Sequence, residues 1–167
     1  YTATLVSYVR GEEAELAGPV RFEVEPLREG TLPRASEREV AAFHEEVTGF
    51  QRALERTSAA LSEHVDRVEA MQVALERAEA TDPELAGRLH EARSDLLQLR
   101  EELSGSEARD EVGEPGPPTP FGRLSVGLRG LASTHGPTEL HRRTVAAGRS
   151  ELEPIRREVT RFGQEVI

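Results

Sequence analysis

The sequence predicts a mainly α-helical fold: an antiparallel bundle of about four helices, one of them long, preceded by a β-hairpin. Residues 36–80 carry one stripe of apolar and small side chains at steps of three and four, which is the spacing of a single helical face. Residues 82–104 and 137–167 repeat this spacing after turn signals. Residues 1–25 instead alternate between apolar and polar side chains over short runs, with the period of two that is typical of strands.

The composition and net charge exclude several kinds of protein and binding site. Apolar residues make up 37% of the 167 residues and charged residues 31%, which suits amphipathic helices in thin layers, and the 4% aromatic share predicts an aliphatic core. The net charge of −10 argues against nucleic-acid binding, because a phosphate-binding surface needs clustered cations. The absence of cysteine excludes disulfides and thiolate sites. No apolar run approaches the ~20 residues needed to cross a bilayer.

The start of the chain is predicted to form two strands. Residues 1–9 are rich in Thr, Val and Tyr, and a hairpin turn is expected at residues 10–13. A hinge at residues 16–19 then leads to a second strand over residues 20–25. Because a lone hairpin is marginally stable in water, we interpret the pair either as the last strands of a β-sandwich or as an edge that docks on another protein.

Capping signals set the expected helix boundaries. Ser36 and Glu39 form a capping-box pattern ahead of the long helix. Thr119 is expected to cap a short helix that begins at Pro120. Thr81 or Asp82 ends the long helix and caps the next, because both are good N-caps and Pro83 fits the first helical turn. So short a connection predicts an antiparallel αα-hairpin. The expected helices are 36–80, 82–104, 119–133 and 137–167.

Glycine and proline mark the weak points of these helices. Gly49 could kink the long helix, and the segment from Gly148 to Pro154 is expected to break or kink the last one. Residues 105–118 are rich in proline and glycine and are expected to form an extended surface crossover. The residues expected to face inward include Val40, Phe43, Val47, Phe50, Leu54, Thr57, Leu61, Val65, Val68, Met71 and Leu75, then Leu85, Leu89, Ala92, Leu96, Leu99 and Leu103, then Phe121, Leu124, Leu128 and Leu131, and finally Leu140, Val145, Leu152, Ile155, Val159, Phe162 and Val166.

Three segments follow from these boundaries. Residues 1–27 are the β-hairpin, residues 28–35 are a linker and residues 36–167 are the helical bundle. Because the sequence opens on Tyr1 within a strand and ends on Ile167 without a helix cap, we expect it to be part of a longer protein. The missing signal peptide therefore carries no weight.

The histidines do not have the spacing of a metal site. The sequence contains neither a His-Glu-x-x-His motif nor the Glu-x-x-His of di-iron bundles, and it has no cysteine to complete a zinc site. We interpret them as helix-surface residues. The five are His44, His64, His90, His135 and His141.

The acidic residues and hydroxyls also lack a catalytic pattern. The pairs Glu12–Glu13, Glu45–Glu46 and Glu101–Glu102 lie in charged neighbourhoods that favour solvated pairing with Arg over acid–base chemistry. Ser and Thr fall mainly at helix caps, and neither a Gly-x-Ser-x-Gly elbow nor a phosphate-binding glycine loop is present. The sequence therefore predicts no catalytic, cofactor-binding or metal-binding residue, and no enzyme.

The long stripe allows two interpretations. It is either the core of the bundle or, in part, an interface for a partner. The helix expected at 82–104 is about half as long as the one at 36–80, so it leaves half of the stripe for the last helix or for another chain.

Several short motifs carry a resemblance to a known family. Residues 18–27 have the form Gly-Pro-x-x-Phe-x-Val-x-Pro-Leu, and further motifs follow at Thr31-Leu32-Pro33, Ala42-Phe43, Leu103-Ser104-Gly105, Glu114-Pro115, Ser133-Thr134 and Pro137-Thr138. In this order they resemble the C-terminal region of bacterial sortilin-like, BNR-repeat β-propeller proteins, a glycosyl-hydrolase-like family. There a strand of that form closes a small β-sandwich and a helical tail follows.

The resemblance implies the end of an Ig-like sandwich, a helical bundle that serves packing or docking, and a periplasmic or extracellular location. It implies no catalytic residue, because the propellers are absent from these residues. Two functions stay open: a non-catalytic structural and protein-interaction module of the bacterial cell envelope, such as an accessory subunit docked on a larger membrane complex, or the bracing region of a propeller hydrolase whose active site lies outside this chain. A protein partner is expected at the β-hairpin edge or the long helix, and neither nucleic acid nor a transmembrane segment is expected.

Overall fold

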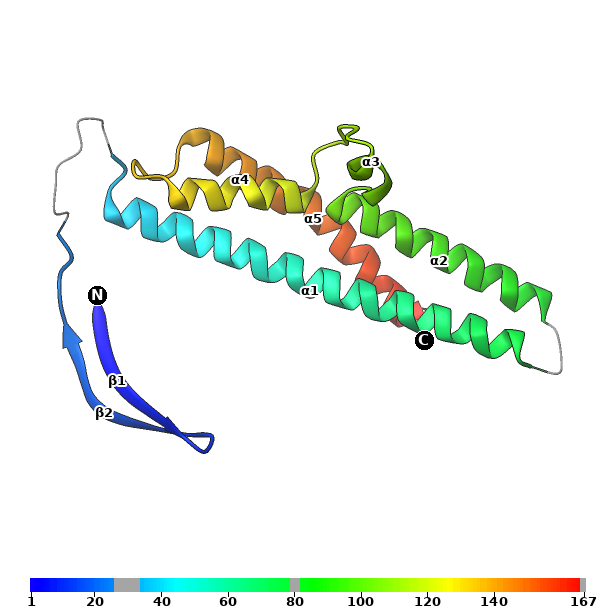
Figure 1. Ribbon diagram of the computed structural model, residues 1–167, viewed down its shortest axis with the longest axis horizontal. Coiled ribbons are helices and arrows are strands. Elements are labelled where there is room, and N and C mark those ends of the chain that lie inside the picture. Colours follow the sequence, from blue (N-terminus) through cyan, green and yellow to red (C-terminus); the bar gives the residue numbers. More distant parts are fainter. Residues whose placement is uncertain (26–33, 79–81, 166–167) are drawn as a thin grey trace. The chain divides into compact units, whose positions relative to one another are not determined.

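The computed structural model describes residues 1–25, 34–78 and 82–165. They belong to two compact units, Tyr1–Pro33 and Arg34–Ile167. The first unit holds a two-stranded antiparallel sheet and the second holds the helices (Figure 1). The predicted fold class, mainly α with an N-terminal β-hairpin, is therefore confirmed.

The hairpin has a tighter turn than the sequence suggests. Strand β1 spans Thr2–Val9 and strand β2 spans Glu12–Arg21, so only Arg10 and Gly11 form the connection. Both turn residues have positive φ, 54° and 88°. Positive φ at both central residues is the geometry of a two-residue turn that matches the twist of the strands. The sequence predicts the turn over residues 10–13, but its last two residues, Glu12 and Glu13, belong to β2.

The predicted hinge at residues 16–19 and second strand at 20–25 are wrong. Strand β2 runs through the expected hinge and ends at Arg21. Ala3 pairs with Val20 and Val6 pairs with Glu15, so three steps along β1 match five along β2, and β2 carries two extra residues as bulges. Gly18, at φ 121°, allows the close approach, since a Cβ there would lie 2.9 Å from the carbonyl oxygen of Ala3.

In the second unit the other long helices pack around the longest one, α1. In Figure 1, α2 and α4 follow one another along α1, and α5 runs back across it. Helix α1 contacts α2, α4 and α5, and α5 also contacts α2 and α4. Helices α4 and α5 of the same chain therefore pack on the part of α1 that the shorter helix α2 does not reach. The helices are α1 (Glu37–Glu76), α2 (Pro83–Ser104), α3 (Glu107–Glu111), α4 (Pro120–Ala132) and α5 (Glu139–Glu165).

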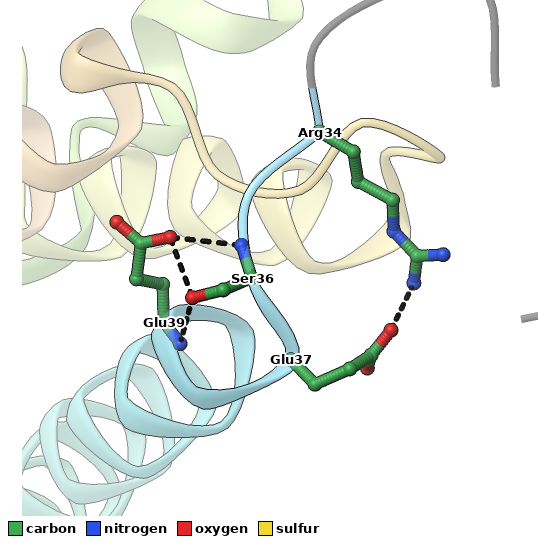
Figure 2. Close-up of polar contacts among 4 residues, drawn as sticks. All are labelled: Arg34, Ser36, Glu37 and Glu39. Carbon is green, nitrogen blue, oxygen red and sulfur yellow. Dashed lines mark hydrogen bonds and ion pairs between the residues drawn. The ribbon is translucent and has the colours of Figure 1, made fainter. Parts of the chain in front are cut away.

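The capping box predicted for α1 is present. The Ser36 hydroxyl accepts the backbone N–H of Glu39 at 3.3 Å, while the backbone N–H and hydroxyl of Ser36 donate to the Glu39 carboxylate at 2.8 and 2.7 Å (Figure 2). These bonds from Ser36 lower the pKa of Glu39, because they favour its charged form. Arg34 pairs with Glu37 at 2.9 Å beside the box.

Side chains cap two further helices where the sequence predicts them. Asp82 accepts the backbone N–H of Leu85 at 3.0 Å, and Thr119 accepts that of Gly122 at 3.1 Å. Each cap is followed by proline at the first helical position, where no N–H is needed. The sequence alone therefore locates the beginnings of α2 and α4.

Most of the predicted core is buried. Eight of the eleven stripe positions on α1 are buried, and the apolar side chains of all four longer helices join one cluster. The buried apolar residues are Phe43, Val47, Phe50, Leu54, Leu61, Val65, Val68, Leu89, Leu96, Leu103, Leu124, Val145, Leu152, Ile155 and Val159.

Four predicted core residues are exposed instead. Met71 and Leu85, at the far ends of α1 and α2, are 38% and 39% exposed, and Leu128 and Leu140 are 43% and 61% exposed. On α4 the buried positions are Pro120, Leu124, Gly127 and Gly130. A Cβ on Gly127 would lie 2.6 Å from Val145, so α4 approaches α5 through its glycines and turns Leu128 away.

The predicted break in the last helix is absent, and the crossover also differs from prediction. Helix α5 runs without a break through Gly148 and Pro154, because Val145, Leu152, Ile155 and Val159 hold one face against the core. The crossover 105–118 is not wholly extended, since it contains the short helix α3. Residues 79–81, 28–33 of the predicted linker, and Val166 lie outside the described residues.

Candidate protein-interaction surface

The strand register separates the hairpin into two unlike faces. Residues paired across an antiparallel ladder share a face. Face A, defined by the odd-numbered residues of β1 and their partners, is mostly apolar. Face B, defined by the even-numbered residues and their partners, is mostly polar. Face A holds Tyr1–Phe22, Ala3–Val20, Leu5–Ala17, Ser7–Ala14 and Val9–Glu12, and face B holds Thr2–Arg21, Val6–Glu15 and Tyr8–Glu13.

Side chains of face A contact one another within the hairpin but remain exposed to solvent. The rings of Tyr1 and Phe22 stack with their centroids 5.8 Å apart, and the two residues exchange backbone hydrogen bonds of 3.0 and 3.1 Å. Leu5 and Val20 remain 60% and 62% exposed. Every residue of β1 and β2 is exposed except Ser7, which is half-buried. An exposed apolar face of this kind marks an interaction surface.

A second candidate is the groove between α2 and α5. It has a volume of about 480 Å³ and is lined by Ala92, Leu99 and Phe162 together with charged residues of both signs, such as Arg88 and Glu158. In the described part of the chain, no three His, Asp or Glu residues come together as a metal site. The groove is therefore lined by a mixture of apolar and charged side chains.

The histidines differ from one another. His44, His90 and His135 are exposed, as their interpretation as surface residues requires, but His64 and His141 are half-buried. The Nδ1 atom of His141 accepts the backbone N–H of Thr138 at 3.0 Å.

His64 is the polar residue that sequence reasoning missed. Its ring lies 5.5 Å from that of Phe162, and its Nδ1 atom is enclosed without a hydrogen-bond partner among the described residues. The sequence does contain a signal, since His64 directly precedes the stripe residue Val65. It lies at the contact of α1 and α5.

The acidic pairs do not converge. Glu12 and Glu13 lie on the hairpin and are exposed, as are Glu101 and Glu102 on α2. Glu46 on α1 pairs with Arg149 on α5 at 3.4 Å.

Two shorter ion pairs join helices. Arg93 of α2 pairs with Glu69 of α1 at 2.9 Å, and Arg123 of α4 pairs with Glu151 of α5 at 2.5 Å. The hydrogen bonds that Arg123 donates to Glu151 raise the pKa of Arg123, because they favour the charged guanidinium. These two ion pairs hold neighbouring helices together.

No protein-family model, curated protein or solved structure matches this chain. Across residues 1–25, 34–78 and 82–165, no helix combines the length and the apolar character needed to cross a membrane. The exposed apolar face A is thus the feature of the described residues that most needs a functional explanation.

Proposed function

We propose that this chain is a non-catalytic structural and protein-interaction module of the bacterial cell envelope, in which the hairpin contacts a partner protein. The observation that carries the proposal is face A, an apolar surface with nothing covering it within the described residues of the hairpin unit. A two-stranded hairpin is marginally stable alone. Covering face A would stabilise both the hairpin and the complex.

Binding through face A requires that several of its apolar side chains are covered at once. Full burial of a Val, Leu or Phe side chain contributes roughly 1.5–3 kcal/mol, and association costs on the order of 4–15 kcal/mol in lost freedom. The partner must therefore cover Leu5, Val9, Val20 and Phe22 together rather than one of them. A sheet packed against face A would do so, as in a β-sandwich.

The long helix is the less favoured contact. Its stripe is already covered by α2, α4 and α5, and eight of its positions are buried within the chain. The role of accessory subunit and the periplasmic or extracellular location rest on the resemblance of residues 18–27 to the sortilin-like strand.

A second candidate follows from the same resemblance. If the chain is the bracing region of a propeller hydrolase, then face A packs on the remainder of a sandwich in the same polypeptide. Mass spectrometry of the natural gene product separates the two. Propeller peptides preceding Tyr1 would support the bracing region, whereas a natural product that begins at or near Tyr1 would support the separate module.

Photocrosslinking from the two hairpin faces tests the proposal. A photoreactive residue replaces Ala17 on face A or, as the matched control, Glu15 on face B of the same strand. We expect Ala17 to give one defined adduct with an envelope protein and Glu15 to give none. Equal labelling from both faces, or adducts only with cytosolic proteins, would contradict the proposal.

A further inference from the structure

The two edges of the hairpin are not equivalent. Strand β2 carries the features that proteins use to block edge-to-edge pairing: Pro19, two bulges and four charged residues, Glu12, Glu13, Glu15 and Arg21. Strand β1, with the sequence TATLVSYV, has no charge, proline, glycine or extra residue. Its eight residues are a regular edge, rich in β-branched side chains, with β2 as its only partner in the described sheet.

The register shows which backbone groups this edge offers. Tyr1 and Phe22 exchange both backbone hydrogen bonds, so the backbone groups of Tyr1 point toward β2. Hydrogen-bonded and non-bonded positions alternate along an antiparallel strand. The N–H and C=O groups of the even-numbered residues, Thr2, Thr4, Val6 and Tyr8, therefore point away from β2.

We infer that β1 pairs antiparallel with β1 of a second copy of this chain, about a two-fold axis at Leu5. In this register Thr2 lies opposite Tyr8 of the second copy and Thr4 lies opposite Val6. All four outward residues of each copy then form hydrogen-bonded pairs. The product is a four-stranded sheet in which the two β1 strands are central.

The charge distribution favours a second copy as the occupant. The chain carries a net charge of −10, yet β1 carries none, so self-pairing places no like charges opposite one another. The pairs that form are Tyr1 with Val9, Thr2 with Tyr8, Ala3 with Ser7, Thr4 with Val6, and Leu5 with Leu5. Aromatic and β-branched side chains recur in them, and such pairs stabilise sheets.

The register also keeps the faces matched. Odd-numbered residues meet odd-numbered residues, so face A of one copy continues into face A of the other. A shift by one residue would place apolar side chains beside polar ones. The inference concerns the edge of the hairpin and does not depend on the proposed function, because face A stays open in the dimer.

Sedimentation equilibrium of the full chain tests the inference first. We expect a mass twice that of the chain at micromolar to millimolar concentration. Val6→Pro removes one outward N–H without touching the bonds to β2 and should yield a monomer with unchanged helical circular dichroism. Val6→Thr, which keeps the N–H and the β-branch, should remain a dimer.

Single cysteines test the register without disturbing the edge, because the sequence has no other cysteine. The two Leu5 Cα atoms would lie roughly 4.5 Å apart as a non-hydrogen-bonded pair, within the range of a disulfide. The two Val6 Cα atoms would be diagonal, roughly 7–8 Å apart. Mild oxidation should therefore couple Leu5→Cys and leave Val6→Cys uncoupled.

Three outcomes would overturn the inference. The first is a monomer at every concentration. The second is a dimer that Val6→Pro leaves intact, and the third is coupling of Val6→Cys as efficient as that of Leu5→Cys. The crosslinking sites at Ala17 and Glu15 lie on β2, so these results do not prejudge the proposed partner.

Discussion

Arg123 on α4 and Glu151 on α5 form a two-pronged ion pair, with Nε to Oε2 at 2.6 Å and Nη2 to Oε1 at 2.5 Å. The side chains are 24% and 38% exposed, so water screens the pair only in part. The fork of the guanidinium matches the two carboxylate oxygens. The pair fixes α4 on α5 at a point next to the core.

A double-mutant cycle with Arg123→Gln and Glu151→Gln should give a coupling free energy of about 1 kcal/mol. The matched control is Arg143–Glu139 within α5, at 3.7 Å with both side chains 73% exposed. It should give roughly 0.3–0.5 kcal/mol. Urea denaturation measures both cycles, and equal couplings would show that the α4–α5 pair has no special role.

Gly148→Ala and Gly49→Ala should change stability in opposite directions. A Cβ on Gly148 would lie 2.7 Å from Phe50 and 3.0 Å from Arg123, whereas a Cβ on Gly49 meets nothing within 4 Å. Alanine in an open helix interior stabilises by roughly 0.5–1 kcal/mol, and overpacking costs roughly 1–3 kcal/mol. Thermal unfolding should show a higher Tm for Gly49→Ala and a lower one for Gly148→Ala. A higher Tm for both would mean that α5 does not pack closely on Phe50.

Leu96→Ala should destabilise the chain far more than Leu128→Ala. Leu96 is fully buried, whereas Leu128 is 43% exposed. Emptying a buried Leu site costs roughly 2–5 kcal/mol, and an exposed truncation costs roughly 0.5 kcal/mol or less. The free energies of unfolding in urea give the comparison. Similar losses would place Leu128 in the core, as the sequence alone predicts.

The capping box should make stability depend on pH. The pKa of Glu39 is lowered by its bonds from Ser36, so its folded-state pKa lies below the ordinary value of 4.5. Its contribution is then present above pH 4.5 and is lost as the pH falls through the lower folded-state pKa. The stability difference between wild type and Glu39→Gln should shrink as the pH falls through this window. A difference that is constant with pH would contradict the account.

The sequence predicts the helical unit well where local chemistry decides. Ser36 and Asp82 mark helix beginnings because side-chain caps leave a clear pattern. Prediction from the sequence fails where tertiary packing decides which side chains are buried. The glycines of α4 do not count as core in an apolar stripe, yet Gly127 and Gly130 form the face against α5 and leave Leu128 outside.

The candidate surface depends on register more than on pattern. The extra residues of β2 interrupt its alternation, so Ala17 joins face A with Val20 although their numbers differ in parity. No period of two reveals this. The sequence therefore suggests the hairpin as a contact, but only the pairing defines which side chains the partner would meet.

Cysteine protection at Val20 and Arg21 tests the central claim most directly, namely that another protein covers face A. These neighbours lie on opposite faces of β2, and the chain has no other cysteine. In the purified chain, Val20→Cys and Arg21→Cys should react with a maleimide at similar rates. In the cells that make the protein, Val20→Cys should be protected and Arg21→Cys should stay reactive, whereas equal reactivity there would contradict the account.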